Sequence, residues 1–157
     1  RRSGRRRIDN AAMPPSQAEL LHHGGRAATW GNLGCWPAAD YPDAAEALAR
    51  AVGRAARLAP GQRVLSLACG AGDELALWRT AFGVDQALGT ERGSGPVPAG
   101  PFDAVVCVDA AYHFSPRRAW IAQAHAHLAP GGHFAFTDLV LQRRAGLLVA
   151  GAARLCG

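Results

Sequence analysis

Apolar residues occur along this chain in short runs and in helical periods, and the two patterns alternate. The apolar runs at 64–68 and 102–109 predict buried strands. Between residues 42 and 58 the apolar positions fall at three- and four-residue steps, which predicts an amphipathic helix that ends at the Pro-Gly pair at 60–61. The same patterns predict helices at 17–23, 73–81, 116–128 and from 142 onward, and strands at 84–89 and 133–141.

The order of these elements predicts an α/β fold. Two strand–helix–strand units joined by a linker form a parallel sheet that helices cover on both faces. Asp73 is the expected N-cap of the helix after the first strand. The linker at 92–101 is rich in Gly and Pro, and its ten residues are too few for a parallel crossover with a strand of its own. We therefore expect three segments along the chain: a disordered basic lead-in at 1–16, an N-terminal helical segment at 17–62 and an incomplete α/β domain at 63–157.

The composition indicates a globular chain whose net charge comes from one short segment at the start of the sequence. Of the 157 residues, 49% are hydrophobic, yet no window holds the roughly 18 consecutive apolar residues of a membrane span. All 17 basic residues are Arg, and five of them lie within residues 1–7; without these five the formal charge of +5 becomes zero. A basic arm can contact nucleic acid or an acidic membrane. We favour a solvated terminus, because no second basic cluster accompanies it, and expect no nucleic-acid partner.

The cysteines and histidines lack the spacing of a metal or redox site. Cysteines stand at 35, 69, 107 and 156, with no CxxC or CxxH pair. His125 and His127 lie two residues apart on a predicted helix and so face different ways. No stretch has the layout of a signal peptide. These observations predict reduced thiols, no metal site and a cytoplasmic location.

The first chemistry-bearing segment is the Gly-rich turn at 68–72, between a predicted strand and a predicted helix. Such a turn lets a ligand approach bare backbone, and the helix N-terminus offers unpaired N–H groups. Glu91 follows Gly72 by 19 residues and ends the next predicted strand, where a carboxylate can accept both hydroxyl hydrogens of an adenosine ribose. Taken alone, the turn is equally consistent with an ordinary Gly turn before a helix that binds no ligand.

A second segment identifies a family. After the strand at 102–109 come Tyr112-His113, a helix, and the Leu-Ala-Pro-Gly-Gly turn at 128–132. Together with the first turn, this order resembles the class I S-adenosylmethionine-dependent methyltransferases, and the resemblance covers about residues 30–141. It implies a Rossmann-like fold, S-adenosylmethionine as cofactor and a small-molecule acceptor. The stretch at 32–36 and the Tyr112-His113 pair most resemble the branch with tocopherol, sterol and phosphoethanolamine methyltransferases and cyclopropane-fatty-acid synthases.

The resemblance implies roles for individual residues. Asp109 through His113 would lie beside the sulfonium, at the carboxyl end of their strand. The expected cofactor-binding residues are Ala68, Cys69, Gly70, Ala71, Gly72, Glu91, Asp109 and Trp36, and the expected catalytic residues are His113 and Tyr112.

Some of these residues have a second interpretation. His113 is either a general base that takes or orients an acceptor proton, or a helix-start histidine that only packs. Trp36 and Tyr41 either close over the sulfonium with their aromatic faces or contribute ordinary packing.

Several departures from the family pattern affect function. Ser66 stands at a usually acidic position and cannot supply that charge toward the methionine ammonium, and Ala68 replaces the first Gly of the turn. Residues 92–101 stand where the family has a helix and its third strand, and the chain ends after the fifth. In family numbering this leaves four strands in the order 2-1-4-5, so the chain resembles a truncated and internally deleted methyltransferase. Two functions stay open: methyl transfer to a small molecule, impaired by the deletion, or a non-catalytic product that binds cofactor weakly or only a protein partner. The oligomeric state is not predicted.

Overall fold

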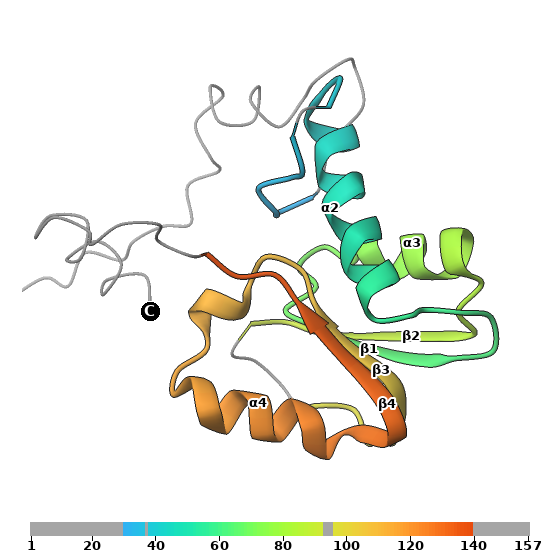
Figure 1. Cartoon of the computed structure of the whole chain (residues 1–157), viewed down its shortest axis with the longest axis vertical. Coiled ribbons are helices and arrows are strands. Elements are labelled where there is room, and N and C mark those ends of the chain that lie inside the picture. The colour runs from blue at the N-terminus through green and yellow to red at the C-terminus, as the bar shows by residue number, and fades with distance from the viewer. Residues whose placement is uncertain (1–29, 37, 93–95, 140–157) are drawn as a thin grey trace, which may run out of the picture.

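The structure is a computed structural model that describes residues 30–36, 38–92 and 96–139. A central parallel sheet lies between helices (Figure 1). The strands are β1 (Arg63–Leu67), β2 (Gln86–Thr90), β3 (Phe102–Cys107) and β4 (Leu128–Phe136). The helices are α2 (Tyr41–Ala55), α3 (Asp73–Phe82), α4 (Arg117–Ala126) and a 3-10 turn at Ala111–His113.

The strand order is β2-β1-β3-β4, and all neighbouring strands are parallel. β1 pairs with β2 on one side, Val64 opposite Ala87, and with β3 on the other, Leu65 opposite Val105. The predicted Rossmann-like sheet and its strand order are thereby confirmed. Within the described residues, no strand pairs with the outer edge of β2, the position that the short linker at 92–101 leaves empty.

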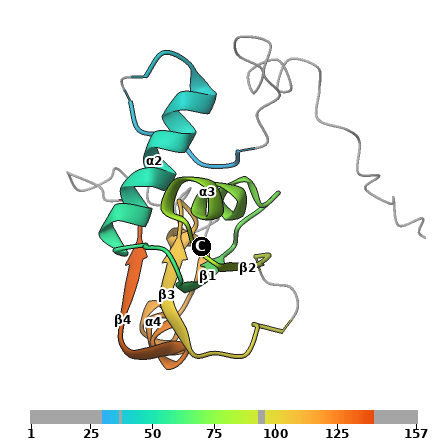
Figure 2. The ribbon, with the colours of Figure 1, turned by 90° about the vertical axis from the view of Figure 1, so that its right-hand side faces the viewer.

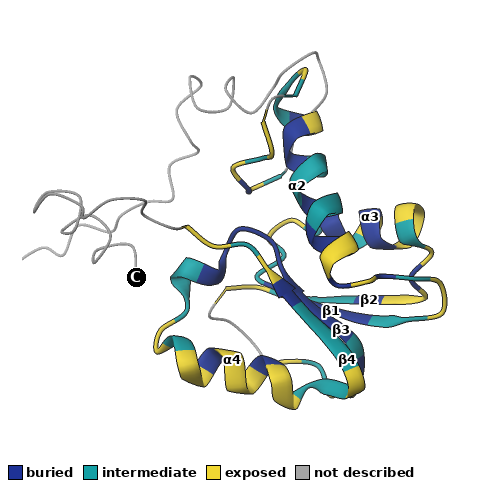
Figure 3. Ribbon diagram, in the orientation of Figure 1, coloured by how far each residue is buried: buried dark blue, intermediate teal, exposed yellow. Residues whose placement is uncertain are grey.

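Helices cover both faces of the sheet, as the sequence predicts. α2 and α3 pack on one face and α4 on the other (Figures 1 and 2). Successive residues of β1 face opposite ways, so Val64 joins the core under α2 and α3 while Leu65 and Leu67 join the core over α4. The central strands are therefore buried on both sides (Figure 3).

Two local predictions were wrong. Helix α3 is capped by Gly72 and not by Asp73: Gly72 has φ +89°, a left-handed conformation that glycine adopts without strain, and no side chain caps the helix. The Pro-Gly-Gly turn at 130–132 lies inside β4, because a register shift between Phe102 and Ala104 absorbs the extra residues. α4 therefore ends at Ala126, before the predicted 128.

Several predictions concern segments outside the described residues, namely the lead-in at 1–16 and the helices at 17–23 and after 142. None of the described helices is long and apolar enough to cross a membrane.

Candidate functional site

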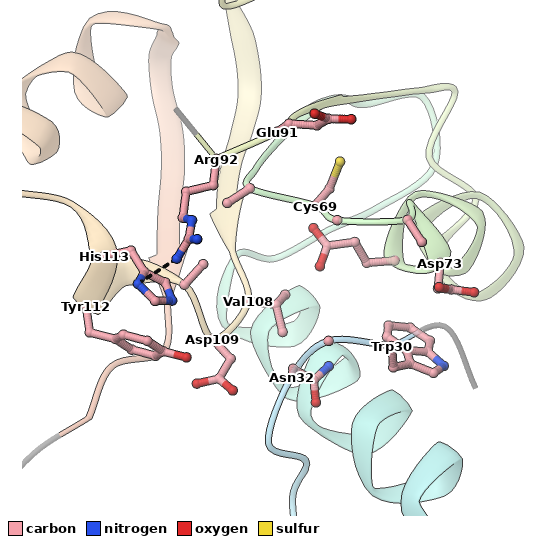
Figure 4. Close-up of a pocket in the computed structure, with 16 residues that line it drawn as sticks. Trp30, Asn32, Cys69, Asp73, Glu91, Arg92, Val108, Asp109, Tyr112 and His113 are labelled. Atoms are coloured by element: carbon pink, nitrogen blue, oxygen red, sulfur yellow. Dashed lines mark hydrogen bonds between the residues drawn. The ribbon is translucent and has the colours of Figure 1, made fainter. Parts of the chain in front are cut away.

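A pocket of about 470 Å³ opens where β1, β2 and β3 end (Figure 4). In an open parallel sheet, ligands bind in the crevice outside these carboxyl ends. Its lining comes from the loop after β1, the residues after β2 and β3, and the segment before α2. The lining residues are Trp30, Gly31, Asn32, Ala68, Cys69, Gly70, Ala71, Asp73, Glu74, Glu91, Arg92, Val108, Asp109, Ala110, Tyr112 and His113.

The loop between β1 and α3 forms one wall and is fixed by the end of β2. The backbone N–H of Cys69 donates to the Thr90 carbonyl at 2.9 Å, and that of Ala68 donates to the Thr90 hydroxyl at 3.3 Å. This close approach requires Gly89, since a Cβ there would overlap the Cys69 sulfur. Ala68 has φ +59°, which costs an L-residue about 1 kcal/mol or more. The loop thus keeps a glycine-like backbone at the position where the sequence has Ala.

Arg92 and His113 meet across the pocket, from the ends of β2 and β3. Nη1 of Arg92 lies 2.9 Å from Nδ1 of His113 (Figure 4). A guanidinium group can only donate, so Nδ1 accepts, and the neutral ring carries its hydrogen on Nε2. In this arrangement His113 offers an N–H donor to the pocket and not the lone pair that a general base needs.

The turn that carries Tyr112 and His113 is held from α4. Arg117 donates to the Ala111 carbonyl and forms an ion pair with Asp138 at 2.8 Å. The rings of Tyr112 and His113 are 4.3 Å apart at 51°. These contacts give both expected catalytic side chains a defined place beside the end of β3.

Asp109 ties the segment before α2 to the sheet. Its carboxylate, in a residue 8% exposed, accepts from the Leu33 N–H at 2.6 Å, and its own N–H donates to the Thr137 hydroxyl at 2.7 Å. Burial raises the pKa of Asp109, and the hydrogen bond from Leu33 partly offsets that shift. Asp109 thereby holds residues 30–32 against the pocket.

Tyr41 holds the same segment from the start of α2. Its hydroxyl lies 2.7 Å from the carbonyl oxygens of both Trp30 and Asn32 and donates its hydrogen between them. Asn32 is buried and bonds through its amide to Ala45 at 3.2 Å. Tyr41 therefore fixes the position of residues 30–32, which line the pocket, but does not line the pocket itself.

Replacing Asp109 with Ala is expected to lower the free energy of unfolding by about 1–2 kcal/mol, because the Leu33 N–H loses a charged acceptor. Asp109 also has φ +52°, which Asn tolerates better than Ala, so Asp109→Asn keeps both the conformation and an acceptor oxygen. Urea unfolding and amide exchange at Leu33 measure the effect. Faster Leu33 exchange in the Ala variant than in the Asn variant is the expected result, and equal exchange in both would contradict the role of Asp109.

Two thiols and a phenol near the site are protonated at neutral pH. Burial raises the pKa of Cys69, and it raises the pKa of Cys107 to about 12. Burial likewise raises the pKa of Tyr112. None of the three is a ready nucleophile at neutral pH, so the polar chemistry of the pocket belongs to its carboxylates and to the Arg92–His113 pair.

Most of the expected site residues surround this one pocket, and two do not. Gly72 is next to the lining as the cap of α3. Trp36 lies outside it: the residue is 56% exposed, and its indole donates to the Leu33 carbonyl at 3.0 Å. The aromatic ring that the segment before α2 brings to the pocket is Trp30 (Figure 4).

Sequence reasoning missed several lining residues, chiefly Trp30, Glu74 and Arg92. Glu74 had a signal in the sequence, since Ser66 stands at a usually acidic position and an acidic pair follows the loop directly. Arg92 had none, because its contact with His113 joins residues that are distant in the sequence.

Comparisons with known proteins identify the family. A family model described as a methyltransferase domain matches residues 41–153. A comparison with curated protein sequences returned no significant match.

Solved structures share the fold. A SAM-dependent methyltransferase from Thiobacillus denitrificans in complex with S-adenosyl-L-homocysteine aligns at TM-score 0.54 and 22% identity, over 68% of this chain and 54% of that one. The [4+2]-cyclase SpnF aligns at TM-score 0.62 and 18% identity, over 91% of this chain and 67% of that one. Coclaurine N-methyltransferase, bound to N-methylheliamine and SAH, aligns at TM-score 0.55 and 12% identity, over 78% of this chain and 42% of that one.

At these identities the likeness shows the fold alone, and this chain spans about half the length of the first of these structures. The predicted resemblance to methyltransferases is confirmed, and the tocopherol and sterol branch stays a prediction. Because the family model covers well over half of the sequence, the chain belongs to the methyltransferase domain family.

Proposed function

We propose that this chain binds S-adenosylmethionine in the pocket and transfers its methyl group to a small-molecule acceptor. The observation that carries this proposal is that the Gly-rich loop, Glu91 and Tyr112-His113 line one pocket at the carboxyl ends of three adjacent strands. Backbone N–H groups at the start of α3, a carboxylate at the end of β2 and aromatic rings suit a cationic nucleoside ligand.

Each part of the pocket has a proposed role. The backbone of residues 68–72 lines the methionine and ribose parts, and Glu91 accepts from the ribose hydroxyls. Trp30 takes the aromatic position that the sequence assigns to Trp36. When bound, the cofactor supplies an electrophilic methyl group on sulfur.

The protein's contribution to transfer is to position the two reactants. Tyr112 and His113 lie beside the end of β3 and orient the acceptor, with the Nε2–H of His113 as a hydrogen-bond donor. Holding the nucleophile in line with the methyl group is the main source of rate enhancement in such a site.

The acceptor and the location are also proposals. A pocket of about 470 Å³ suits a small molecule better than a nucleic-acid strand, and the chain is neutral apart from its first Arg cluster. The described cysteines form no disulfides, which fits a cytoplasmic setting.

A non-catalytic role is the competing proposal. In the described residues β2 is an edge strand, so no further strand supports the pocket beyond Glu91. The fold also does not decide the reaction, since a [4+2]-cyclase has it.

Calorimetric titration with S-adenosylhomocysteine tests the proposal. We expect saturable micromolar binding that falls about 10- to 100-fold in Glu91→Ala, which loses a charged acceptor for the ribose hydroxyls. Asp85→Ala, an exposed carboxylate outside the pocket, is the matched control and should bind like the wild type. Absence of heat from chain that circular dichroism shows to be folded would refute cofactor binding and favour the non-catalytic role.

A further inference from the structure

A buried carboxyl group in the pocket has no assigned role. Glu74 lies in the first turn of α3, is 6% exposed and lines the pocket beside the Gly-rich loop. Its Oε1 is buried and has no hydrogen-bond partner among the residues that the structure describes. Leaving a buried polar atom unpaired is unfavourable, so its retention at a binding pocket indicates a ligand that pairs with it.

The surrounding residues hold this carboxyl in place. Nε1 of Trp78 donates to the Ser66 hydroxyl at 2.8 Å, and both residues are fully buried. Since that hydroxyl already accepts from the indole, its hydrogen is left to donate, and Ser66 lowers the pKa of the neighbouring Glu74 carboxyl as a hydrogen-bond donor does. The relay from Trp78 through Ser66 satisfies part of the carboxyl and leaves Oε1 for a ligand.

Ser66 therefore has a positive role at the position where the family is usually acidic. A carboxylate at 66 would lie near Glu74, on which Ser66 acts directly, and two carboxylates sharing one buried site repel each other. The neutral hydroxyl of Ser66 instead stabilises the charged form of Glu74, since it lowers the pKa of that carboxyl. In this chain the acidic group lies in the first turn of α3, as Glu74, and lines the pocket.

The charges facing Glu74 favour a cationic ligand group. Asp73 on its own helix is acidic and, after burial, contributes to raising its pKa, which reaches about 7. Ser66 on β1 is neutral, and the thiols of Cys69 and Cys107 are protonated at neutral pH. Across the pocket, Glu91 and Asp109 are carboxylates, while Arg92 contacts His113. Because none of the described residues pairs with Oε1, we assign the group that completes Glu74 to the ligand.

We propose that Glu74 binds the α-ammonium group of the methionine part of the cofactor, held for that purpose by Ser66 and Trp78. This inference rests on the proposed function. An ammonium group has three N–H donors, which suit a carboxylate with one oxygen unpaired. The Gly-rich loop next to Glu74 is where the methionine part is proposed to lie.

The test compares two ligands in calorimetric titration: S-adenosylhomocysteine, which has the ammonium group, and 5′-methylthioadenosine, which lacks the amino-acid part. In Glu74→Gln we expect affinity for S-adenosylhomocysteine to fall about 10- to 100-fold, the effect of losing one charge-assisted bond, with methylthioadenosine unchanged. Glu46→Gln, a carboxylate on α2 outside the pocket, is the matched control and should leave both affinities unchanged.

A pH series gives a second readout. Binding the ammonium requires the charged carboxylate, so wild-type affinity should rise as the pH passes through about 7. The other titratable groups remain in Glu74→Gln, so the difference between the two proteins isolates Glu74. Unchanged S-adenosylhomocysteine affinity in Glu74→Gln, an equal loss for both ligands, or identical pH profiles would overturn the inference and leave the proposed function standing. Failure of the wild type to bind either ligand would instead refute the proposed function.

Discussion

Replacing Trp78 with Ala lowers the free energy of unfolding by about 3–5 kcal/mol, the range for truncating a buried large aromatic residue. Trp78 is fully buried between α3 and the sheet, packs edge-to-face on Phe82 at 5.8 Å and donates to Ser66. The buried core under α2 and α3 consists largely of Ala and Val, so most of its side chains are too small to fill the space. Small domains are stable by about 5–15 kcal/mol in total, so this change removes a large fraction. Urea unfolding followed by circular dichroism measures it.

Two further variants separate the contributions. Trp36→Ala makes the same substitution at a residue that is 56% exposed and should change the free energy of unfolding by no more than about 0.5 kcal/mol. Trp78→Phe keeps most of the apolar packing and loses the hydrogen bond to Ser66, so we expect a loss of about 1–2 kcal/mol. Similar losses for Trp78→Ala and Trp36→Ala would show that Trp78 is not a central core residue.

The sheet was predictable because its central strands are buried on both faces. The runs at 64–68 and 102–109 are almost wholly apolar, a pattern specific to strands under two helical layers, and β1 and β3 match them within a residue or two. The cap of α3 was not predictable in this way. Asp is a good N-cap in general, but the loop must first turn back beneath the helix, and only Gly72 takes that left-handed conformation freely. The cap of α3 is therefore set by which residue can adopt a left-handed backbone without strain, and N-cap preferences of residue types do not include that requirement.

The candidate site was predictable to the extent that topology determines it. Residues that follow parallel strands meet at one edge, so the Gly-rich loop, Glu91 and Asp109 were expected together, and they line one pocket. Which tryptophan of residues 30–36 faces that pocket depends on the bond from Leu33 to Asp109, between residues 76 positions apart. The contact between Arg92 and His113 depends likewise on two chain segments meeting. Pattern reasoning finds positions at strand ends, but it does not find side-chain pairs that only the folded chain creates.

The free energy of unfolding of the wild type should depend on Glu74 between pH 4.5 and 7. Burial raises the pKa of Glu74 from 4.5 to about 7, so the folded chain binds the proton more tightly than the unfolded chain. The stabilisation from protonated Glu74 is fully present below pH 4.5 and is lost as the pH rises through about 7. A shift of this size corresponds to about 3 kcal/mol. Urea unfolding at pH 4.5, 6, 7 and 8 measures the loss.

Glu74→Gln isolates this contribution, because Gln keeps the shape and an acceptor for Ser66 but has no proton to lose. We expect the variant to match the wild type at pH 4.5 and to exceed it by up to about 3 kcal/mol at pH 8. Asp109, whose pKa burial also raises, titrates in both proteins and cancels in the difference. A constant difference across the series would mean that Glu74 does not ionise in this range. The predicted divergence of the two stabilities links the two roles of the residue. A carboxylate that destabilises the empty pocket above pH 7 is the group that an incoming ammonium stabilises, so Glu74→Gln should gain stability as it loses affinity for S-adenosylhomocysteine.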